Sequence, residues 1–92
     1  MNIERLEHGS KGAFIIKENN KRVAEMTYSV AGENLIIIDH TEVSDSLRGT
    51  GAGKQLVTAA VNYAREKDIK ILPLCPFAKK VFDKTPEFRD VL

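Results

Sequence analysis

A glycine-rich loop is the segment of this sequence best suited to binding a ligand. Residues 48–54 read Arg-Gly-Thr-Gly-Ala-Gly-Lys and lie between a strand pattern and a helix pattern. Glycines let the backbone approach a ligand closely and adopt a positive φ. The N–H groups that begin a helix are unpaired and lie at the positive end of its dipole. Because Arg48 and Lys54 add formal charge on either side, the loop favours a phosphate or pyrophosphate ligand.

Two familiar nucleotide-binding motifs do not fit this loop. A Walker A motif, GxxxxGK[ST], requires Gly at position 48 and Ser or Thr at position 55, where this chain has Arg48 and Gln55. A dinucleotide fingerprint, GxGxxG, requires a third Gly where this chain has Lys54 or Leu56. A flexible turn without a ligand therefore stays open as the alternative at this point.

A histidine, a glutamate and the single cysteine could carry acid–base or nucleophilic chemistry. His40 has an ordinary pKa of about 6.5, suited to accepting a proton from an ammonium group. In an extended strand Glu42 shares the His40 face, whereas Asp39 lies on the opposite face and is not expected to orient His40. Cys75 directly precedes a helix start at Pro76, which lowers a thiol pKa in principle. The alternatives are a satisfied histidine at the end of a buried strand and a cysteine that acts as a small buried hydrophobe.

Strand patterns fill the first half of the chain and must position His40. Residues 13–18, 22–30 and 35–43 are apolar or alternate with a period of two, and turn residues separate them. The short connections predict an antiparallel meander in which 35–43, the most apolar run, is the central strand. One face of the second run carries Ala24, Met26, Tyr28 and Val30.

The second half of the chain changes to helical periodicity. Residues 51–67 carry the apolar stripe of an amphipathic helix, and residues 69–75 read as a further strand. Pro73 lacks an N–H, so we expect it at a sheet edge or where pairing stops. A last helix begins at Pro76 and ends before Pro86. This order predicts an α+β, or mixed α/β, sandwich with a largely antiparallel sheet. The stripe consists of Gly53, Leu56, Val57, Ala60, Val61 and Ala64.

Length and composition predict one small domain, residues 1–92. The chain is 42% hydrophobic and 29% charged, and 14 Lys+Arg against 13 Asp+Glu give a net charge of +1. This balance argues against nucleic acid as a partner, and no apolar run approaches the roughly 20 residues that span a bilayer. With one cysteine, two histidines and no signal-peptide pattern, we expect no internal disulfide, no metal site and a cytoplasmic location.

The charge is unevenly divided along the chain. Residues 1–46 hold five basic and eight acidic side chains, a net of −3, and residues 47–92 hold nine basic and five acidic, a net of +4. The positive half contains the glycine-rich loop, where an anionic ligand would bind. The negative half contains the strands, from which a cationic substrate could approach.

The loop matches a third motif, R/Q-x-x-G-x-G/A, at Arg48, Gly51 and Gly53. Together with the runs IIDHTEVSDSLRGTGAGKQLV and IKILPLCPFAKKVF, it resembles the very small members of the GNAT acetyltransferase superfamily. The resemblance covers nearly the whole chain. It implies a GNAT-like, mostly antiparallel twisted sheet with two splayed strands, packed against two main helices. It also implies that the two helices which follow the first strand in typical GNAT proteins are absent.

The resemblance implies acetyl-CoA as cosubstrate. The pyrophosphate would bind the loop, the pantetheine arm would lie along the end of the strand at Glu42 and Val43, and Phe77 and Lys80 would flank the cofactor. The implied cofactor-binding residues are Glu42, Val43, Arg48, Gly49, Thr50, Gly51, Ala52, Gly53, Lys54, Phe77 and Lys80.

Amine attack on a thioester needs a base, oxyanion stabilisation and protonation of the leaving thiolate. Typical GNAT enzymes often use a tyrosine near the last helix as the acid, but here Tyr28 and Tyr63 lie elsewhere in the sequence. Cys75 is the candidate near the thioester, either as a thiol acid or as an acyl-accepting nucleophile. His40 is the candidate base, and Glu42 is the alternative base or an attraction for a cationic amine.

Three functions remain open from the sequence. The favoured one is an acetyl-CoA-dependent N-acyltransferase acting on a primary amine of a small molecule or protein. The second is an acyl-CoA-binding module with little or no catalysis, because the absent helices normally help to build the acceptor site. The third is an interaction domain with a vestigial loop. We expect a monomer, with a weak dimer as the alternative.

Overall fold

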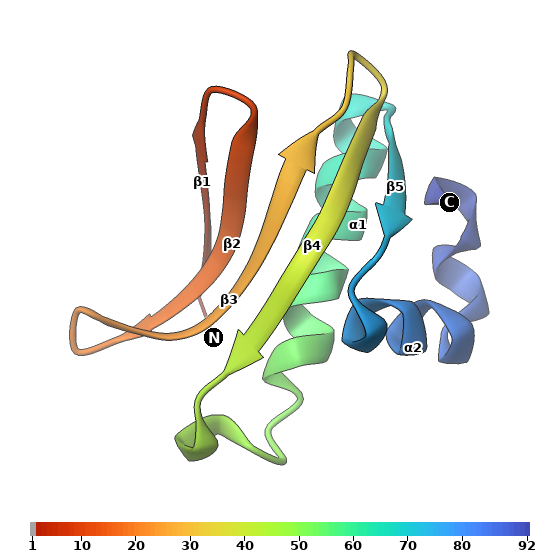
Figure 1. Cartoon of the computed structure of the whole chain (residues 1–92). Helices are drawn as coiled ribbons and strands as arrows, with labels where there is room; N and C mark the ends of the chain where they lie inside the picture. The colour runs from red at the N-terminus through yellow and green to blue at the C-terminus, as the bar shows by residue number, and fades with distance from the viewer. Residues whose placement is uncertain (1) are drawn as a thin grey trace.

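A computed structural model describes residues 2–92 as a five-stranded sheet with two α-helices and two 3-10 helices (Figure 1). No helix in this part of the chain is long and apolar enough to cross a membrane. The elements are β1 (Ile3–His8), β2 (Lys11–Glu18), β3 (Lys21–Val30), β4 (Leu35–Val43), η1 (Asp45–Leu47), α1 (Ala52–Lys67), β5 (Lys70–Pro73), α2 (Pro76–Lys84) and η2 (Pro86–Val91).

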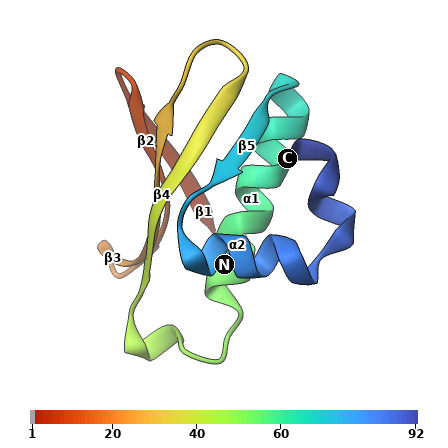
Figure 2. The ribbon, with the colours of Figure 1, turned by 45° about the vertical axis from the view of Figure 1, so that its right-hand side comes forward.

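The sheet order follows the chain, β1-β2-β3-β4-β5, with antiparallel pairing through β4 and parallel pairing of β5 to β4. Both α-helices pack on one face of the sheet, the inner face, and Figure 2 shows the two layers. Within residues 2–92 a two-residue turn joins β1 directly to β2, so the helices that typical GNAT proteins carry after the first strand are absent there. The predicted α+β fold and antiparallel meander are confirmed.

β1 was not predicted from the sequence. Its inner face carries one apolar residue, Ile3, followed by Arg5 and Glu7, so the strand lacks an apolar alternation. Both polar groups are satisfied at Tyr28: its hydroxyl donates to Glu7 Oε1 at 2.8 Å and accepts from Arg5 Nη1 at 3.1 Å. The Arg5 guanidinium also lies 4.3 Å from the centre of the Tyr63 ring.

The prediction that residues 35–43 form the central strand was wrong. The extra strand β1 makes β3 the middle strand of the five, and β4 lies between β3 and β5. The apolar first half of β4 is explained by this interior position, because Ile36 and Ile38 are buried under α1 and α2.

The core lies between the inner sheet face and α1. All six stripe residues of α1 are buried, and so are Ala24, Met26 and Tyr28 of β3. These predictions are therefore confirmed. Each large side chain buried in this way contributes about 1.5–3 kcal/mol to stability.

Pro73 lies on the edge strand β5, in the last residue pair that joins β5 to β4, opposite Ile38. The sequence prediction for this proline is confirmed, because a residue without an N–H is tolerated where pairing stops. β4 continues for five residues beyond this pair, so the two strands separate here.

Candidate functional site

The separation of β4 from β5 produces the opening around which the candidate site is built. The N–H groups of Leu74 and Cys75 both donate to the Ile38 carbonyl, at 3.1 and 3.2 Å, and so end the parallel pairing. Beyond that point, no strand of the described part of the chain pairs with residues 39–43 of β4 on the β5 side. We call the space between these residues and residues 74–75 the β4–β5 gap. It leaves backbone groups of β4 free for a ligand that can pair with a strand edge.

A β-bulge in β4 decides which side chains face the gap from each side. His40 pairs with Thr27 and Ile38 pairs with Tyr28, so Asp39 is an extra residue with no partner of its own. Paired residues of an antiparallel ladder share a face. After the bulge, His40 therefore lies on the outer face, away from the helices, and Thr41 lies on the inner face.

The predicted orientation of Asp39 was wrong. Ser29, on the outer face, donates through Oγ to Asp39 Oδ2 at 2.7 Å, so Asp39 lies on the same face as His40. The prediction assumed a regular strand, and the bulge interrupts that alternation. The expectation that Asp39 does not orient His40 agrees with this geometry, because its carboxylate is bonded to Ser29.

Cys75 lies on the inner side of the β4–β5 gap, directly before α2, and is 4% exposed. Its Sγ is 3.3 Å from Thr41 Oγ1, across the gap. Burial raises the pKa of the Cys75 thiol, but the Thr41 hydroxyl and then the N–H groups at the start of α2 lower it by more. The pKa of Cys75 therefore lies below its ordinary value.

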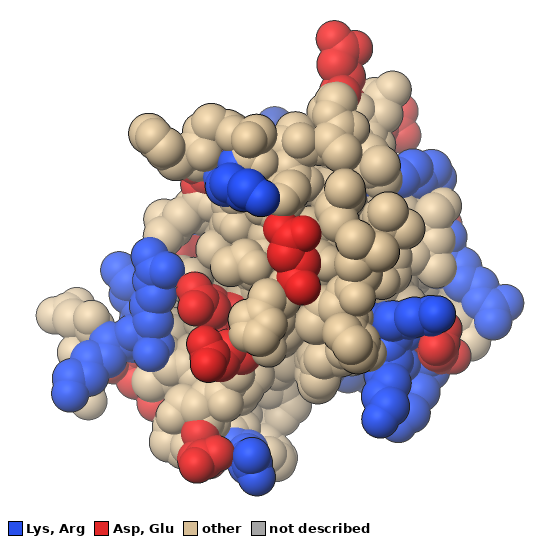
Figure 3. All heavy atoms as spheres, in the orientation of Figure 1, with Lys and Arg blue, Asp and Glu red and all other residues tan. Residues whose placement is uncertain are grey.

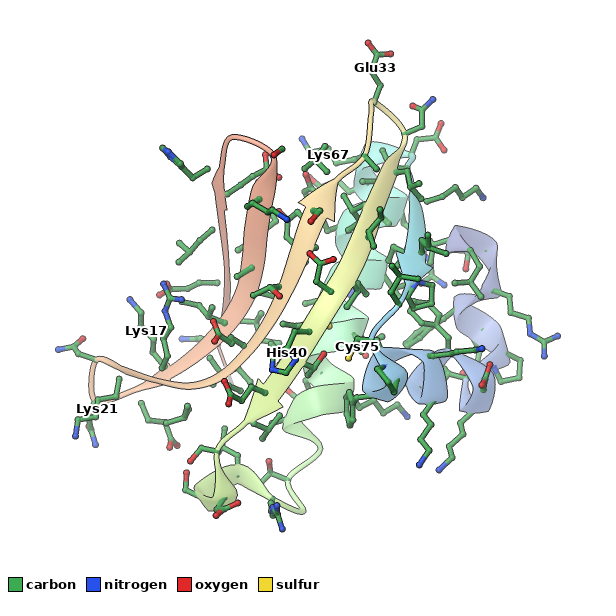
Figure 4. All side chains as sticks on the ribbon, viewed as in Figure 1. Lys17, Lys21, Glu33, His40, Lys67 and Cys75 are labelled. Carbon is green, nitrogen blue, oxygen red and sulfur yellow. The ribbon has the colours of Figure 1, made fainter. Side chains whose placement is uncertain are left out.

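His40 and Glu42 are brought together on the outer face, but the structure does not bring either of them to Cys75. Figure 4 shows His40 on the near side of β4 and Cys75 at the junction of β5 and α2. Glu42 pairs with Glu25 of β3, and both line a shallow hollow of about 340 Å³ that also reaches Asp45. Acidic side chains lie across the middle of this face in Figure 3, which gives it a negative potential.

The glycine-rich loop delivers free donors to the start of α1. Gly51 is the residue before the helix and has φ = +78°, a left-handed conformation that favours glycine. Among residues 2–92, no backbone carbonyl accepts from the N–H groups of Gly49 or of residues 51–54. Five N–H groups without a backbone acceptor thus lie in the loop and at the start of the helix, an arrangement that suits an anion, and the binding of one stays a prediction.

Thr50 differs from the other loop residues. Its N–H donates to the Leu47 carbonyl at 3.2 Å and its hydroxyl donates to the same carbonyl at 2.6 Å. These bonds stabilise the turn that presents the neighbouring N–H groups.

Arg48 forms an ion pair with Asp45, with Nε 3.1 Å from Oδ1, but both side chains are more than 80% exposed. The ion pair is therefore weak, and Arg48 can leave Asp45 to bind an anionic ligand.

The Phe77 ring packs against the first turn of α1 at Gly53. The sequence alone did not indicate this contact. A Cβ at Gly53 would overlap the Phe77 ring, so this glycine is required by close packing rather than by its backbone angle. Phe77 is still 41% exposed. It therefore offers an aromatic surface between the loop and the β4–β5 gap.

Both tyrosines lie away from the β4–β5 gap, as the sequence suggested. Tyr28 is fully buried beneath β1, and burial together with its bond to Glu7 raises its pKa to about 12, although Arg5 opposes this. Tyr63 lies on α1 under Arg5. Neither side chain can supply the acid of typical GNAT enzymes.

A sequence model of the GCN5-related N-acetyltransferase family matches residues 13–91. The chain belongs to this family. The match covers the strands around the β4–β5 gap, the glycine-rich loop and both α-helices, so it confirms the resemblance that the motifs indicated.

Relatives of this family member include a GCN5-like protein from Staphylococcus aureus, solved by NMR. It is 43% identical, with a TM-score of 0.71 over 98% of this chain and 87% of that one. Protein NATD1 from Xenopus tropicalis is 32% identical over 84 residues, which are 89% of this chain and 77% of NATD1. The matches to chicken and mouse NATD1 span 57% of those proteins.

A more distant similarity concerns the fold alone. The aminoglycoside N-acetyltransferase AAC(6')-Iy, solved in complex with CoA, is 18% identical to this chain. Its TM-score is 0.59, over 84% of this chain and 67% of that protein.

Proposed function

We propose that this chain is an acetyl-CoA-dependent N-acyltransferase that acts on a primary amine of a small molecule or protein. The observation that carries the proposal is the β4–β5 gap beside a loop with five unpaired N–H groups. Family membership supports acyl transfer in general, and the CoA complex of AAC(6')-Iy supports CoA as the ligand.

The cofactor would use both features at once. Its pyrophosphate would accept hydrogen bonds from the loop N–H groups, with Arg48 and Lys54 supplying positive charge. Its pantetheine arm would pair with the free β4 edge at Glu42 and Val43. The thioester would then lie in the gap near Phe77, with Lys80 available on the exposed side of α2.

The two faces of β4 would supply the two proton transfers. An amine approaching over the outer face meets His40 as the base, with Glu42 as the alternative base, in a negative surrounding that favours a cationic substrate. On the inner side, the Cys75 thiol would protonate the leaving CoA thiolate, or Cys75 would accept the acyl group as a thiolate. If Cys75 acts as the thiol acid, acetyl transfer to the amine is direct and needs no covalent enzyme intermediate.

A second function is favoured by the open outer face. Both α-helices lie on the inner face, so the acceptor side consists of the sheet surface alone. An acyl-CoA-binding module with little or no catalysis would need the loop and the gap but no enclosed acceptor site. The expected cytoplasmic location and monomeric state, with a weak dimer as the alternative, stay predictions for either function.

CoA binding is tested by an NMR titration of the nitrogen-15-labelled chain. We expect chemical shift changes at residues 49–54 and at Val43. Gly51→Val should weaken CoA binding by about tenfold or more, because a β-branched side chain at φ = +78° restricts the loop and blocks backbone approach.

Gly32→Val is the matched control, because Gly32 has φ = +86° in the turn between β3 and β4 and is equally open. It should cost similar stability and leave the CoA affinity unchanged. The absence of shifts at residues 49–54 at millimolar CoA would contradict both cofactor-dependent functions.

Catalysis is tested by acetyl transfer to a panel of amines and peptides. We expect His40→Ala and Cys75→Ala to reduce turnover by about 10²-fold or more while the CoA affinity changes little, since both act on protons in the transition state. Turnover no faster than in buffer for every amine would favour the binding module. Intact-mass measurement after incubation with acetyl-CoA asks separately whether Cys75 becomes acylated.

A further inference from the structure

Among residues 2–92, Thr41 is the side chain that hydrogen-bonds to the Cys75 sulfur across the β4–β5 gap. The distance from its Oγ1 to Sγ is 3.3 Å, within the range of a hydrogen bond to sulfur. Thr41 is held in place by β4, where it pairs with Met26 of β3. Cys75 is held by the bond from its own N–H to the Ile38 carbonyl and by the start of α2. Both partners therefore have fixed backbones.

We propose that Thr41 is a positioning residue for Cys75, and that its hydroxyl holds the sulfur at the inner side of the β4–β5 gap in both the thiol and the thiolate form. The contact stands on geometry alone; its use in acyl transfer rests on the proposed function.

A hydroxyl suits this task because it can both accept and donate. In the thiol form, the Cys75 S–H donates to Thr41 Oγ1. In the thiolate form, the Thr41 O–H rotates and donates to the sulfur, which also faces the N–H groups of Phe77 and Ala78 and the backbone N–H of Thr41. Neither side chain needs to leave its position when the proton leaves.

The sulfur of Cys75 is surrounded by neutral N–H groups, and the nearby titratable residues of β4 lie on the opposite face. Cys75 is buried in the hydrophobic core cluster, and the N–H groups that face it are the neutral dipoles named above. His40 and Glu42 lie on the other face of β4. The Thr41 hydroxyl lowers the pKa of Cys75 more than any of the N–H groups, so it is the main side-chain group available to stabilise the thiolate.

In the proposed reaction, Thr41 and Cys75 support the proton transfer to the leaving CoA thiolate. The Cys75 S–H bond breaks as the S–H bond of CoA forms, so the proton passes to the leaving thiolate and Cys75 becomes the thiolate. Solvent later returns a proton to Cys75. Thr41 donates to the Cys75 thiolate between these two events, and it exchanges no proton with CoA.

The decisive experiment titrates Cys75 in the chain without CoA. Cys75 is the only cysteine, so carbon-13-labelled cysteine gives one Cβ signal whose shift with pH reports the pKa of this thiol. We expect Thr41→Val to raise the pKa of Cys75 and leave about tenfold less thiolate at a given pH. Thr41→Ser should retain the wild-type titration, because it keeps the hydroxyl.

Thr58→Val is the matched control, since Thr58 on α1 loses a hydroxyl that donates to the Lys54 carbonyl and makes no contact with sulfur. It should leave the Cys75 titration unchanged. If Thr41→Val does not fold, the same titration of Cys75 is carried out on Thr41→Ala, with the same expected rise of the Cys75 pKa. A Thr41→Val titration that coincides with the wild type would overturn the proposal, and so would a Thr41→Ser shift as large as that of Thr41→Val.

The kinetic readout separates this inference from the proposed function. With acetyl-CoA and an accepted amine, Thr41→Val should lower kcat by about tenfold, leave KM for acetyl-CoA unchanged and move the pH–rate profile, whereas Thr41→Ser should restore both. If no amine is acetylated at all, the proposed function fails while the Cys75 titration still decides the role of Thr41.

Discussion

Gly51 and Gly53 are required for different physical reasons, although the sequence presents them as one motif. Gly51 adopts a positive φ with open space where a side chain would lie, and Gly53 packs against the Phe77 ring. The positive φ of Gly51 allows the chain to turn into α1. The contact between Gly53 and Phe77 places α2 against the start of α1, next to the candidate cofactor site.

Gly53→Ala should displace the Phe77 ring, because the new methyl group and the ring cannot share the space. Phe77 is half-exposed and can turn outward, so we expect a stability change within about 1 kcal/mol and a CoA affinity lowered by about three- to tenfold. Calorimetric titration and thermal unfolding measure the two effects.

The Gly53→Ala/Phe77→Ala double variant supplies the control for this prediction. If Gly53→Ala acts through the ring, its effect on CoA affinity should largely disappear once Phe77 is removed. Independent, additive effects of the two substitutions would show that Gly53 contributes in another way.

Among the elements, β1 is attached to the core by a polar contact instead of an apolar stripe. Glu7, Arg5 and the fully buried Tyr28 hydroxyl form this contact, with the Arg5 guanidinium on the Tyr63 ring. Because buried polar groups are costly unless paired, the attachment depends on the protonated state of Tyr28.

The stability of the fold should therefore fall at alkaline pH in a way that depends on Tyr28. Its pKa is about 12 in the folded chain and about 10 when unfolded. The stabilising contribution is fully present below pH 10 and is lost as the pH rises to about 12, amounting to about 2–3 kcal/mol. Urea unfolding between about pH 9 and 12 should show this loss in wild type and a smaller one in Tyr28→Phe. Tyr63→Phe, the matched control, should follow the wild type.

The elements also show what the sequence could and could not predict. The α1 stripe and Pro73 follow from local periodicity and from a missing N–H, and both were predicted. β1 was not, because Arg5 and Glu7 occupy its inner face and find their partners only in the folded chain. The bulge at Asp39 was not predicted either, since register is a property of two strands together and β4 alone does not contain it.

The same reasoning divides the candidate site. The loop donors and Cys75 could be proposed from motifs and from their place before a helix. The Thr41 contact and the Phe77 packing could not, because each joins residues from separate elements, and the first depends on the unpredicted bulge.

At the scale of the whole molecule, positive and negative side chains occupy different regions. In Figure 3, acidic groups lie across the middle of the outer sheet face, and Lys and Arg gather at both sides, including the side of α2. An anionic cofactor at the loop and a cationic substrate over the sheet would each find an attractive field. The division of charge along the sequence is kept only in part, because Lys17 and Lys21 of the negative half lie at the β2–β3 end of the sheet (Figure 4).

CoA affinity should consequently decrease with ionic strength. Lys54→Gln and Lys80→Gln should each lower the affinity about two- to fivefold at low salt, and the difference from wild type should shrink as salt screens the charges. Lys21→Gln removes the same charge at the distant start of β3 (Figure 4) and should have no effect. Equal effects of all three substitutions would point to net charge alone.

The bulge at Asp39 sets which side chains of β4 face each side of the gap. Ile38 and His40 pair with consecutive residues of β3, so deleting Asp39 would leave a regular strand with His40 still on the outer face and Thr41 still on the inner face. Pairing Asp39 as an ordinary ladder residue would instead shift every residue after it by one position and turn His40 toward the core and Thr41 toward solvent. A relative that lacks the bulge residue can therefore keep the same side chains on the two sides of the gap, whereas one that keeps the length of β4 but loses the bulge will exchange them.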